Sequence, residues 1–354
     1  MQTKIITINE NQVSKEPIDI AADILRQGGT VAFPTETVYG LGANALDTRA
    51  VEGIFKAKGR PGDNPLIVHI VDIKQMDKLV KSIPEKAIKL AQAFWPGPLT
   101  MVFKKLVCVP SAVTAGLDTV AIRIPAHPVA QQIICAADIP IAAPSANRSG
   151  KPSPTTAKHV MQDLLGKIDA IVDGGSATLG LESTVIDMTA KVPVLLRPGS
   201  ITLEQLREVV GKVDVAQGVL EALEKSAIVR SPGMKYTHYA PTADVVVVEG
   251  ETAKVVDAIQ TLIQQEKAKG RKVGVLSMDE TAHAYEEADH VLSVGSQKKL
   301  ETIAAKLFAQ LREFDKTDVD IIFAQSISNE GIGMAIRNRL NKAAGYRVIK
   351  VNEK

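Results

Sequence analysis

The sequence predicts an α/β protein with two domains, a larger one built on a twisted mixed sheet with flanking helices and a smaller, parallel, Rossmann-like one. Short apolar runs alternate with segments of helical periodicity through most of the 354 residues. Two such runs, at 183–188 and 192–197, form a hairpin-like pair, which indicates that the first sheet is mixed. The alternation becomes irregular between residues 211 and 242 and then resumes, as expected where one domain gives way to another.

The first two hundred residues contain seven runs that predict strands and four segments that predict helices. The strands are expected at 30–35, 65–70, 99–104, 119–124, 140–145, 169–174 and 183–188, and the helices at 18–26, 49–58, 85–94 and 202–210. Asp47 or Thr48 is placed to cap the second helix, and Thr202 the last.

In the second part of the chain, predicted strands and helices alternate as in a doubly wound domain. Strands are expected at 244–249, 272–277, 290–295, 319–324 and 347–351, with helices ending near Gly270, spanning about 298–313 and running through Arg337. We therefore expect a larger domain over residues 1–210, a linker over 211–242 and a Rossmann-like domain over 243–354.

The composition is that of an ordinary globular protein. With 42 Lys+Arg against 40 Asp+Glu, a protein that holds nucleic acid by bulk charge is disfavoured. Aromatic residues make up 4% of the chain, which argues against a base-stacking platform. Cys108 and Cys135 form no paired framework, the first residues lack the apolar stretch expected of a signal peptide, and no run of about 18 uncharged apolar residues occurs. We expect a soluble, cytoplasmic protein without a membrane contact.

Several familiar catalytic patterns are missing or incomplete. Residues 40–45, GLGANA, match a loose dinucleotide-binding pattern, but a lone match is weak, so we interpret them as a turn beside some other ligand. No Gly-Lys pair is followed by Ser or Thr, and the sequence has no nucleophile elbow and no Cys/His zinc cluster. A hydrolase with an activated nucleophile, or a metalloenzyme with a protein-built metal cage, therefore has little support.

Polar loops punctuated by glycine and proline adjoin the predicted strands. They lie at 34–43, 55–66, 123–128, 143–155, 181–185 and 195–199. Together they carry the cations Lys56, Lys58, Arg60, Arg123, Arg148, Lys151 and Arg197, and the neutral groups Thr35, Thr37, Ser145, Asn147, Ser149, Ser153, Ser183 and Thr184. Many cations and hydroxyls without a nucleophile–base pair suit a polyphosphate and a carboxylate.

The loop sequences, taken in order, resemble those of the YrdC-like family. The matching stretches are PTETVYGLGANA, KAKGRPGDNPL, WPGPLT, RIPAHP, APSANRSGKPSPT, STVID and LRPGS. The segment SPGMKYTHYAP and the α/β tail resemble the longer, two-domain form of the family. This resemblance implies a nucleotidyltransferase that joins L-threonine, bicarbonate and ATP into threonylcarbamoyl-AMP and releases pyrophosphate. A partner complex would then transfer the threonylcarbamoyl group to the adenosine next to the tRNA anticodon.

The residues themselves suit this reaction. The carbamate formed from threonine and bicarbonate attacks the α-phosphorus of ATP, so the protein needs to position substrates and neutralise charge. Lys58 and Arg60, a K-x-R pair at a helix end, suit phosphate oxygens, although a solvated helix terminus also attracts cations. Asn64 can donate to a ligand or serve as a turn residue before Pro65.

The resemblance implies two groups of site residues. It places Lys58, Arg60, Ser145 and Asn147 at the catalytic centre. To ATP it assigns Arg60, Asn64, Thr119, Ser145, Ser153, Arg197 and Tyr239, and to threonine Thr37, His69, Arg123, Ala143 and Ser183. Without the resemblance, Arg123 would be interpreted as half of a surface ion pair and His69 as a core histidine.

The resemblance and the residues also suggest how cofactor and partners are used. Mg²⁺ is expected to arrive on the ATP phosphates, with no protein-built metal site and no organic cofactor. We interpret Lys235, Tyr236, His238 and Tyr239 as part of a lid, the alternative being a passive tether. A direct contact with RNA stays open.

Two other classes of protein are considered. A non-catalytic RNA-binding module would share the basic loops, but it predicts stacking aromatics and a stronger positive charge. A maturation factor that uses carbamoyl phosphate would carry further acylphosphatase-like and zinc-finger regions, whereas this chain has two cysteines.

Overall fold

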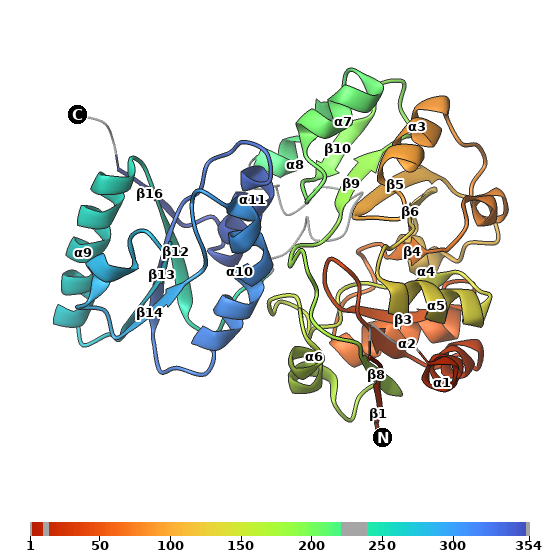
Figure 1. Ribbon diagram of the computed structural model, residues 1–354, viewed down its shortest axis with the longest axis horizontal. Helices are drawn as coiled ribbons and strands as arrows, with labels where there is room; N and C mark the ends of the chain where they lie inside the picture. Colours follow the sequence, from red (N-terminus) through yellow and green to blue (C-terminus); the bar gives the residue numbers. More distant parts are fainter. Residues whose placement is uncertain (1, 10–13, 221–238, 352–354) are drawn as a thin grey trace. The chain divides into compact units, whose positions relative to one another are not determined.

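The computed structural model describes residues 2–9, 14–220 and 239–351 and divides the chain into two compact units (Figure 1). Met1–Ser149 and Ser153–Lys235 form the first unit, and Gly150–Pro152 and Tyr236–Lys354 the second. The sequence-based domain limits stay a prediction, because the change of unit near residue 235 falls outside the described residues.

The first unit is organised around one eleven-stranded sheet. Its strands are β1 (Lys4–Thr7), β2 (Val31–Phe33), β3 (Gly40–Asn44), β4 (Ile67–His69), β5 (Leu99–Lys104), β6 (Thr119–Arg123), β7 (Ile141–Ala142), β8 (Ala170–Asp173), β9 (Thr184–Asp187), β10 (Val194–Arg197) and β11 (Asp214–Val215). Their order is β1-β8-β2-β3-β7-β4-β6-β5-β9-β10-β11.

This sheet contains both parallel and antiparallel pairs, which confirms the predicted mixed sheet. β4 and β6 are parallel, β5 and β6 are antiparallel, and β9 and β10 form the antiparallel pair expected from the hairpin-like sequence.

Two strands differ from the expectations. Residues 40–44, interpreted as a turn, form β3, because Leu41 and Ala43 are fully buried and the strand pairs with β2 and β7. β11 pairs with β10, so the sheet continues beyond residue 210.

The helices of the first unit surround the sheet. They are α1 (Lys15–Arg26), α2 (Thr48–Lys58), α3 (Glu85–Phe94), α4 (Ser111–Thr114), α5 (Pro128–Ala137), α6 (Ala157–Leu164), α7 (Leu203–Val210) and α8 (Gln217–Leu220), with a 3₁₀ helix at Ile73–Lys78. α1 and α5 pack together over the core around Leu25, Phe33 and Ile133.

Capping residues explain where the two best-predicted helices begin. Asp47 accepts hydrogen bonds from Arg49 N and Ala50 N at the start of α2, and Thr202 makes a capping box with Gln205 at the start of α7. α2 ends at Gly59, whose φ of 59° turns the chain between Lys58 and Arg60.

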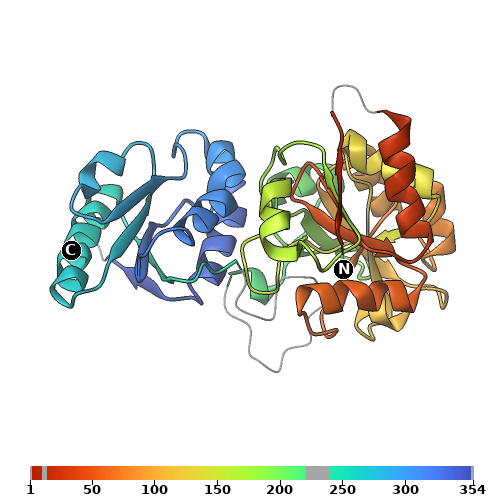
Figure 2. The ribbon, with the colours of Figure 1, turned by 90° about the horizontal axis from the view of Figure 1, so that it is seen from below.

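The second unit is a parallel five-stranded sheet in the order β14-β13-β15-β12-β16. Its elements are β12 (Asp244–Glu249), α9 (Thr252–Ala268), β13 (Val273–Ser277), a 3₁₀ helix (Ala282–Tyr285), β14 (His290–Ser293), α10 (Leu300–Phe314), β15 (Ile321–Gln325), α11 (Gly333–Ala343) and β16 (Val348–Lys350). α9 covers one face, and α10 and α11 cover the other (Figures 1 and 2). This confirms the predicted parallel, Rossmann-like domain.

Residues 150–152 lie between the two sequence segments of the first unit but belong to the second unit. Lys151 Nζ lies 2.9 Å from Asp315 Oδ2, and Arg312 donates to the carbonyl of Pro152 at 2.5 Å. Among the described residues, no helix is long and apolar enough to cross a membrane.

Candidate active site

Strand β6 connects the two groups of predicted site residues in the first unit. Thr119 and Arg123 are its first and last residues, about 13 Å apart for an extended strand. The parallel register pairs His69 of β4 with Arg123. On the other side, the register of β5 brings Thr100 to the same level as Arg123. The Arg123 end of β6 therefore gathers side chains from adjacent strands.

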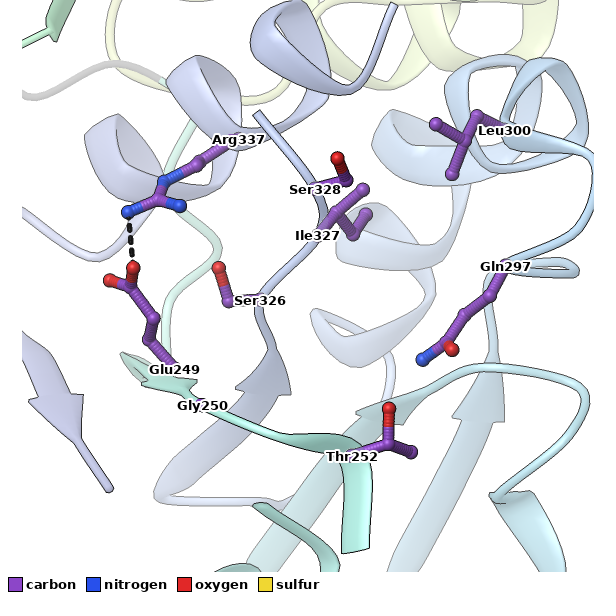
Figure 3. Close-up of a pocket in the computed structure, with 9 residues that line it drawn as sticks. All are labelled: Glu249, Gly250, Thr252, Gln297, Leu300, Ser326, Ile327, Ser328 and Arg337. Atoms are coloured by element: carbon purple, nitrogen blue, oxygen red, sulfur yellow. Dashed lines mark hydrogen bonds and ion pairs between the residues drawn. The ribbon is translucent and has the colours of Figure 1, made fainter. Parts of the chain in front are cut away.

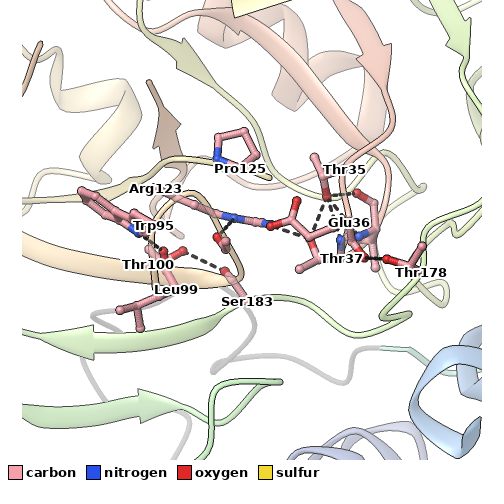
Figure 4. Close-up of polar contacts among 12 residues, drawn as sticks. Thr35, Glu36, Thr37, Trp95, Leu99, Thr100, Arg123, Pro125, Thr178 and Ser183 are labelled. Atoms are coloured by element: carbon pink, nitrogen blue, oxygen red, sulfur yellow. Dashed lines mark hydrogen bonds and ion pairs between the residues drawn. The ribbon is translucent and has the colours of Figure 1, made fainter. Parts of the chain in front are cut away.

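Arg123 is 3% exposed, and its guanidinium is held on three sides (Figure 4). Its Nε donates to the carbonyl of Gly97 at 3.1 Å, and its Nη1 donates to Thr37 Oγ1 at 3.0 Å. Its Nη2 lies 2.6 Å from Glu36 Oε1 in a buried ion pair. These contacts fix the plane of the charge, so the guanidinium of Arg123 is already oriented within the protein.

Glu36 is a site residue that the sequence analysis missed. Burial raises the pKa of its carboxyl, but the charge and hydrogen bonding of Arg123 outweigh burial and hold that pKa below its ordinary value. A buried carboxylate therefore stands beside the arginine. The only signal in the sequence was its position between the two threonines of PTET.

His69 lies at the end of β4 as a buried, neutral imidazole. Burial and the neighbouring charge of Arg123 lower its pKa to about 3. Its Nδ1 is 3.2 Å from the carbonyl oxygen of Ile67. At neutral pH it is therefore a hydrogen-bonding group without a charge.

Ser183, one of the residues expected to bind threonine, is hydrogen-bonded to Arg197. Its hydroxyl lies 2.7 Å from Thr100 Oγ1, while Arg197 donates to the Ser183 carbonyl at 3.0 Å and to its hydroxyl at 3.1 Å. Gly199 permits this arrangement, because a Cβ there would lie 2.4 Å from Thr184 N. Arg197, expected on the nucleotide side, thus contacts a residue expected on the threonine side.

The K-x-R and S-x-N motifs are joined by a buried lysine. Lys58 is 3% exposed, and its amine donates to the carbonyls of Ser145 and Asn147. Ser145 in turn donates to Asn147 Oδ1 at 2.5 Å. The structure therefore places Lys58 under the 145–147 loop as a group that holds its backbone.

The other predicted ATP residues in this unit lie in or near the same loops. Arg60 donates to the carbonyls of Asn64 and Pro65 at 3.0 and 3.3 Å. Asn64 is 1% exposed, and its Oδ1 finds no hydrogen-bond partner among the described residues. The β4–β6 register, continued by two residues, brings Pro65 opposite Thr119. A buried amide oxygen without a partner is a typical feature of a ligand site.

Three remaining positions are less closely connected. Ser153 is fully buried and donates to Glu182 Oε1 at 2.5 Å, and the Ala143 N–H donates to the carbonyl of Ile67. Tyr239 belongs to the second unit, where its ring stacks on Phe308 with centroids 4.9 Å apart. The other expected lid residues, Lys235, Tyr236 and His238, lie outside the described residues.

The site combines two kinds of chemistry on one scaffold. One end of β6 offers a buried, oriented cation with hydroxyls and a neutral imidazole, and loops rich in cations and amides lie towards the other end. Within the described part of the chain, no three His, Cys, Asp or Glu side chains are grouped so that they could hold a metal ion.

Comparisons with known proteins cover both units. The family described as "Telomere recombination" (Sua5_yciO_yrdC) matches residues 23–199, and the family described as "Threonylcarbamoyl-AMP synthase, C-terminal domain" matches residues 201–345. The fold and the site thus define a YrdC-like α/β enzyme with an additional carboxy-terminal domain.

Full-length relatives narrow this class. The threonylcarbamoyl-AMP synthase of Pyrococcus abyssi is 52% identical over 349 residues, covering 99% of this chain and 100% of the relative. That of Bacillus subtilis is 53% identical over 352 residues, covering 98% and 97%. The crystal structure of P. abyssi Sua5 complexed with L-threonine matches with a TM-score of 0.94 and 51% identity, covering 99% of this chain and 100% of that one. The chain belongs to the threonylcarbamoyl-AMP synthase family.

Proposed function

We propose that this chain joins L-threonine, bicarbonate and ATP into threonylcarbamoyl-AMP and releases pyrophosphate, using the two ends of β6 for its two larger substrates. The observation that carries the proposal is the oriented Arg123, with Thr37 and Glu36 on one side and the Thr100–Ser183 pair at its level. Support also comes from the relative at 51% identity whose structure contains L-threonine.

Threonine binds with its carboxylate at Arg123 and Thr37. Because Gly97, Thr37 and Glu36 already fix the guanidinium plane, little rotational freedom is lost when the substrate arrives. Ser183 and the main chain at Ala143 complete the amino-acid pocket. His69 acts as a neutral hydrogen-bonding group, since a pKa of about 3 makes it too weak a base to deprotonate the threonine amine.

ATP binds at the loops near the Thr119 end. Arg60, Asn64 and Ser145 contact the nucleotide, with Arg60 neutralising phosphate charge and the buried Asn64 amide completing its hydrogen bonding on the ligand. Lys58 acts as a positioning residue, because its amine holds the carbonyls of the loop that contains Ser145. Thr119, Ser153, Arg197, Asn147 and Tyr239 complete the proposed nucleotide contacts.

The reaction proceeds by direct transfer between substrates. The threonine amine adds to bicarbonate and water leaves, giving a carbamate, whose oxygen attacks the α-phosphorus while pyrophosphate departs. No covalent intermediate with the protein is needed. The chain's contribution is the orientation of both substrates and the stabilisation of the extra negative charge on the α-phosphate.

Mg²⁺ enters with the nucleotide. The described residues offer no cluster of three ligating side chains, so the phosphate oxygens and water would supply its ligands. When bound, Mg²⁺ neutralises phosphate charge and assists the departure of pyrophosphate.

The product is consumed in tRNA modification next to the anticodon by a transferase complex, which places the enzyme in the cytoplasm. Residues 1–210 form the catalytic domain, 211–242 a lid and 243–354 a separate Rossmann-like domain. Tyr239 is the lid's contact with the nucleotide.

The proposal is tested by incubating the purified full chain with ATP, Mg²⁺, bicarbonate and labelled L-threonine. We expect mass spectrometry to detect labelled threonylcarbamoyl-AMP, and pyrophosphate release to require threonine and bicarbonate together. D-threonine serves as the matched control, because it offers the same groups with the wrong handedness. Pyrophosphate release at the same rate with and without threonine would instead identify an enzyme that hydrolyses ATP. RNA binding without any pyrophosphate release would favour the non-catalytic RNA-binding module.

A further inference from the structure

The second unit contains a cavity whose lining residues are all distinct from those of the proposed synthase site. The cavity's volume is about 400 Å³, and its lining includes Glu249, Thr252, Gln297, Leu300, Ser326 and Arg337 (Figure 3). This volume lies within the usual range for pockets that bind small molecules, roughly 300–1,000 Å³.

The topology of the sheet explains why a cavity forms there. The lining residues follow the carboxyl ends of β12, β14 and β15, and β12 and β15 are neighbours in the sheet. The chain leaves β12 for α9 on one face and leaves β15 for α11 on the other (Figures 1 and 2). Loops that diverge to opposite faces open a crevice between adjacent strands, and open α/β sheets bind their ligands at such points.

The helix dipoles and the guanidinium of Arg337 favour an anion in this cavity, while the exposed Glu251 and Glu301 stand at the same two helix starts. Thr252 and Leu300 are the first residues of α9 and α10, and neither helix start is capped by a side-chain hydrogen bond. Their first N–H groups can therefore donate to a ligand oxygen, and the helix dipoles favour negative charge. Arg337 of α11 adds a planar cation, and the exposed Lys298 and Lys299 lie on the loop between two lining residues.

The remaining groups favour hydroxyls on the same ligand. Glu249 Oε1 accepts from Arg337 Nη2 at 2.6 Å, and both side chains are 27% exposed. This half-buried carboxylate, at the end of β12, can accept hydroxyl hydrogens, as can the Ser326 hydroxyl beside it and the Gln297 amide (Figure 3). The loop after β12 has one glycine, Gly250, and lacks the glycine-rich pyrophosphate turn of dinucleotide sites.

From these observations we propose that the cavity binds a small phosphate monoester that carries hydroxyl groups, a sugar phosphate or a nucleoside monophosphate. The phosphate lies between Arg337 and the starts of α9 and α10, and the hydroxyls face Glu249 and Ser326.

The test is calorimetric titration of the full chain with ribose 5-phosphate, AMP and inorganic phosphate. Arg337→Gln removes the cation, and Thr252→Asp places a negative charge at the first turn of α9, where it supports the helix but repels phosphate. Arg347→Gln is the matched control, because Arg347 pairs with Asp244 at the opposite end of β12. Thermal unfolding checks that each variant is folded, and the exposed Thr252 keeps the test valid if Arg337→Gln is unstable.

We expect ribose 5-phosphate to bind with a Kd below about 1 mM, and both cavity variants to weaken it by about tenfold or more while the control does not. Binding of AMP that both variants weaken, without binding of ribose 5-phosphate, would narrow the ligand to a nucleotide. The proposal is overturned if neither ribose 5-phosphate nor AMP binds, or if the Kd of the ester that binds is unchanged in both cavity variants. It is also overturned if inorganic phosphate binds with the same Kd as the ester. AMP binding that is insensitive to both variants would belong to the ATP site of the first unit and would also count against it.

Discussion

Replacing Arg123 with lysine separates the binding of threonine from the binding of ATP. The variant keeps the positive charge beside Glu36 but loses the planar fork that reaches Gly97, Thr37 and Glu36 together. One ammonium group cannot reproduce three interactions that point in different directions. We expect Arg123→Lys to bind threonine poorly and to be less stable than the parent.

The expected size of the effect follows from these interactions. A hydrogen bond to a charged group contributes about 1.5–3 kcal/mol, so losing one on the substrate carboxylate raises the KM for threonine about 10- to 150-fold. Within the protein, the variant also breaks buried hydrogen bonds of the guanidinium, which lowers the free energy of unfolding by about 2–4 kcal/mol. The KM for ATP should stay within about threefold, since the loops proposed to bind the nucleotide lie towards the other end of β6, about 13 Å away.

Pyrophosphate release, measured while one substrate is varied and the others saturate, gives both KM values, and urea unfolding gives the stability. Arg207→Lys is the control, because the exposed Arg207 also donates two N–H groups, both to the carbonyl of Val213. Neither KM should change in that variant. An equal rise of both KM values in Arg123→Lys would show that Arg123 supports the fold and does not bind threonine.

Three further outcomes are expected. Lys58→Met removes the hydrogen bonds that the amine donates to the carbonyls of Ser145 and Asn147. We expect the KM for ATP to rise about tenfold and the melting temperature to fall, while the KM for threonine hardly changes. An unchanged KM for ATP would show that the amine does not position this loop for the nucleotide. The pKa of His69 is lowered to about 3 in the folded protein, so between about pH 6.5 and 3 the imidazole is protonated in the unfolded chain but not in the folded one. The free energy of unfolding therefore decreases as the pH is lowered through this range. Between pH 7 and pH 5, this histidine should lower the free energy of unfolding by about 2 kcal/mol. Urea unfolding at several pH values would show it as a steeper dependence of that free energy on pH in the parent than in His69→Gln, and an equal pH dependence in the two proteins would refute it. Ser183→Ala leaves a donor of the buried Arg197 without its hydroxyl partner, so we expect a loss of about 1–2 kcal/mol in stability by thermal unfolding, and no loss would mean that this hydrogen bond contributes nothing.

Elements with strong periodicity or clear caps were predictable from the sequence. α2 and α7 begin at Asp47 and Thr202 as expected, and β5 spans 99–104, as predicted. β3 was not predictable, because a glycine-containing run of five residues has little strand propensity. It forms a strand because it is buried between β2 and β7, a tertiary effect that local sequence does not report.

Candidate site residues could be selected from the sequence, but the contacts among them could not be predicted. Arg123 and Ser145 could be selected from their loops, whereas the role of Lys58 depends on the approach of residues 87 and 89 positions later in the chain. Glu36 was missed for the same reason, since its partner Arg123 lies on a strand far away in sequence. Contacts between distant segments decide which cation meets a ligand and which supports a loop.

The buried amine of Lys58 also bears on the chemical durability of the enzyme. A mixed anhydride of a carbamate and a phosphate is an acylating reagent, and a lysine amine beside it is a natural target for irreversible self-modification. Lys58 is 3% exposed, and its amine directs N–H groups at two carbonyl oxygens, so it is less accessible to the product than a lysine on the surface. Exposed lysines such as Lys56 have no such protection. After many turnovers, peptide mapping should therefore find threonylcarbamoyl adducts on surface lysines and an unmodified Lys58.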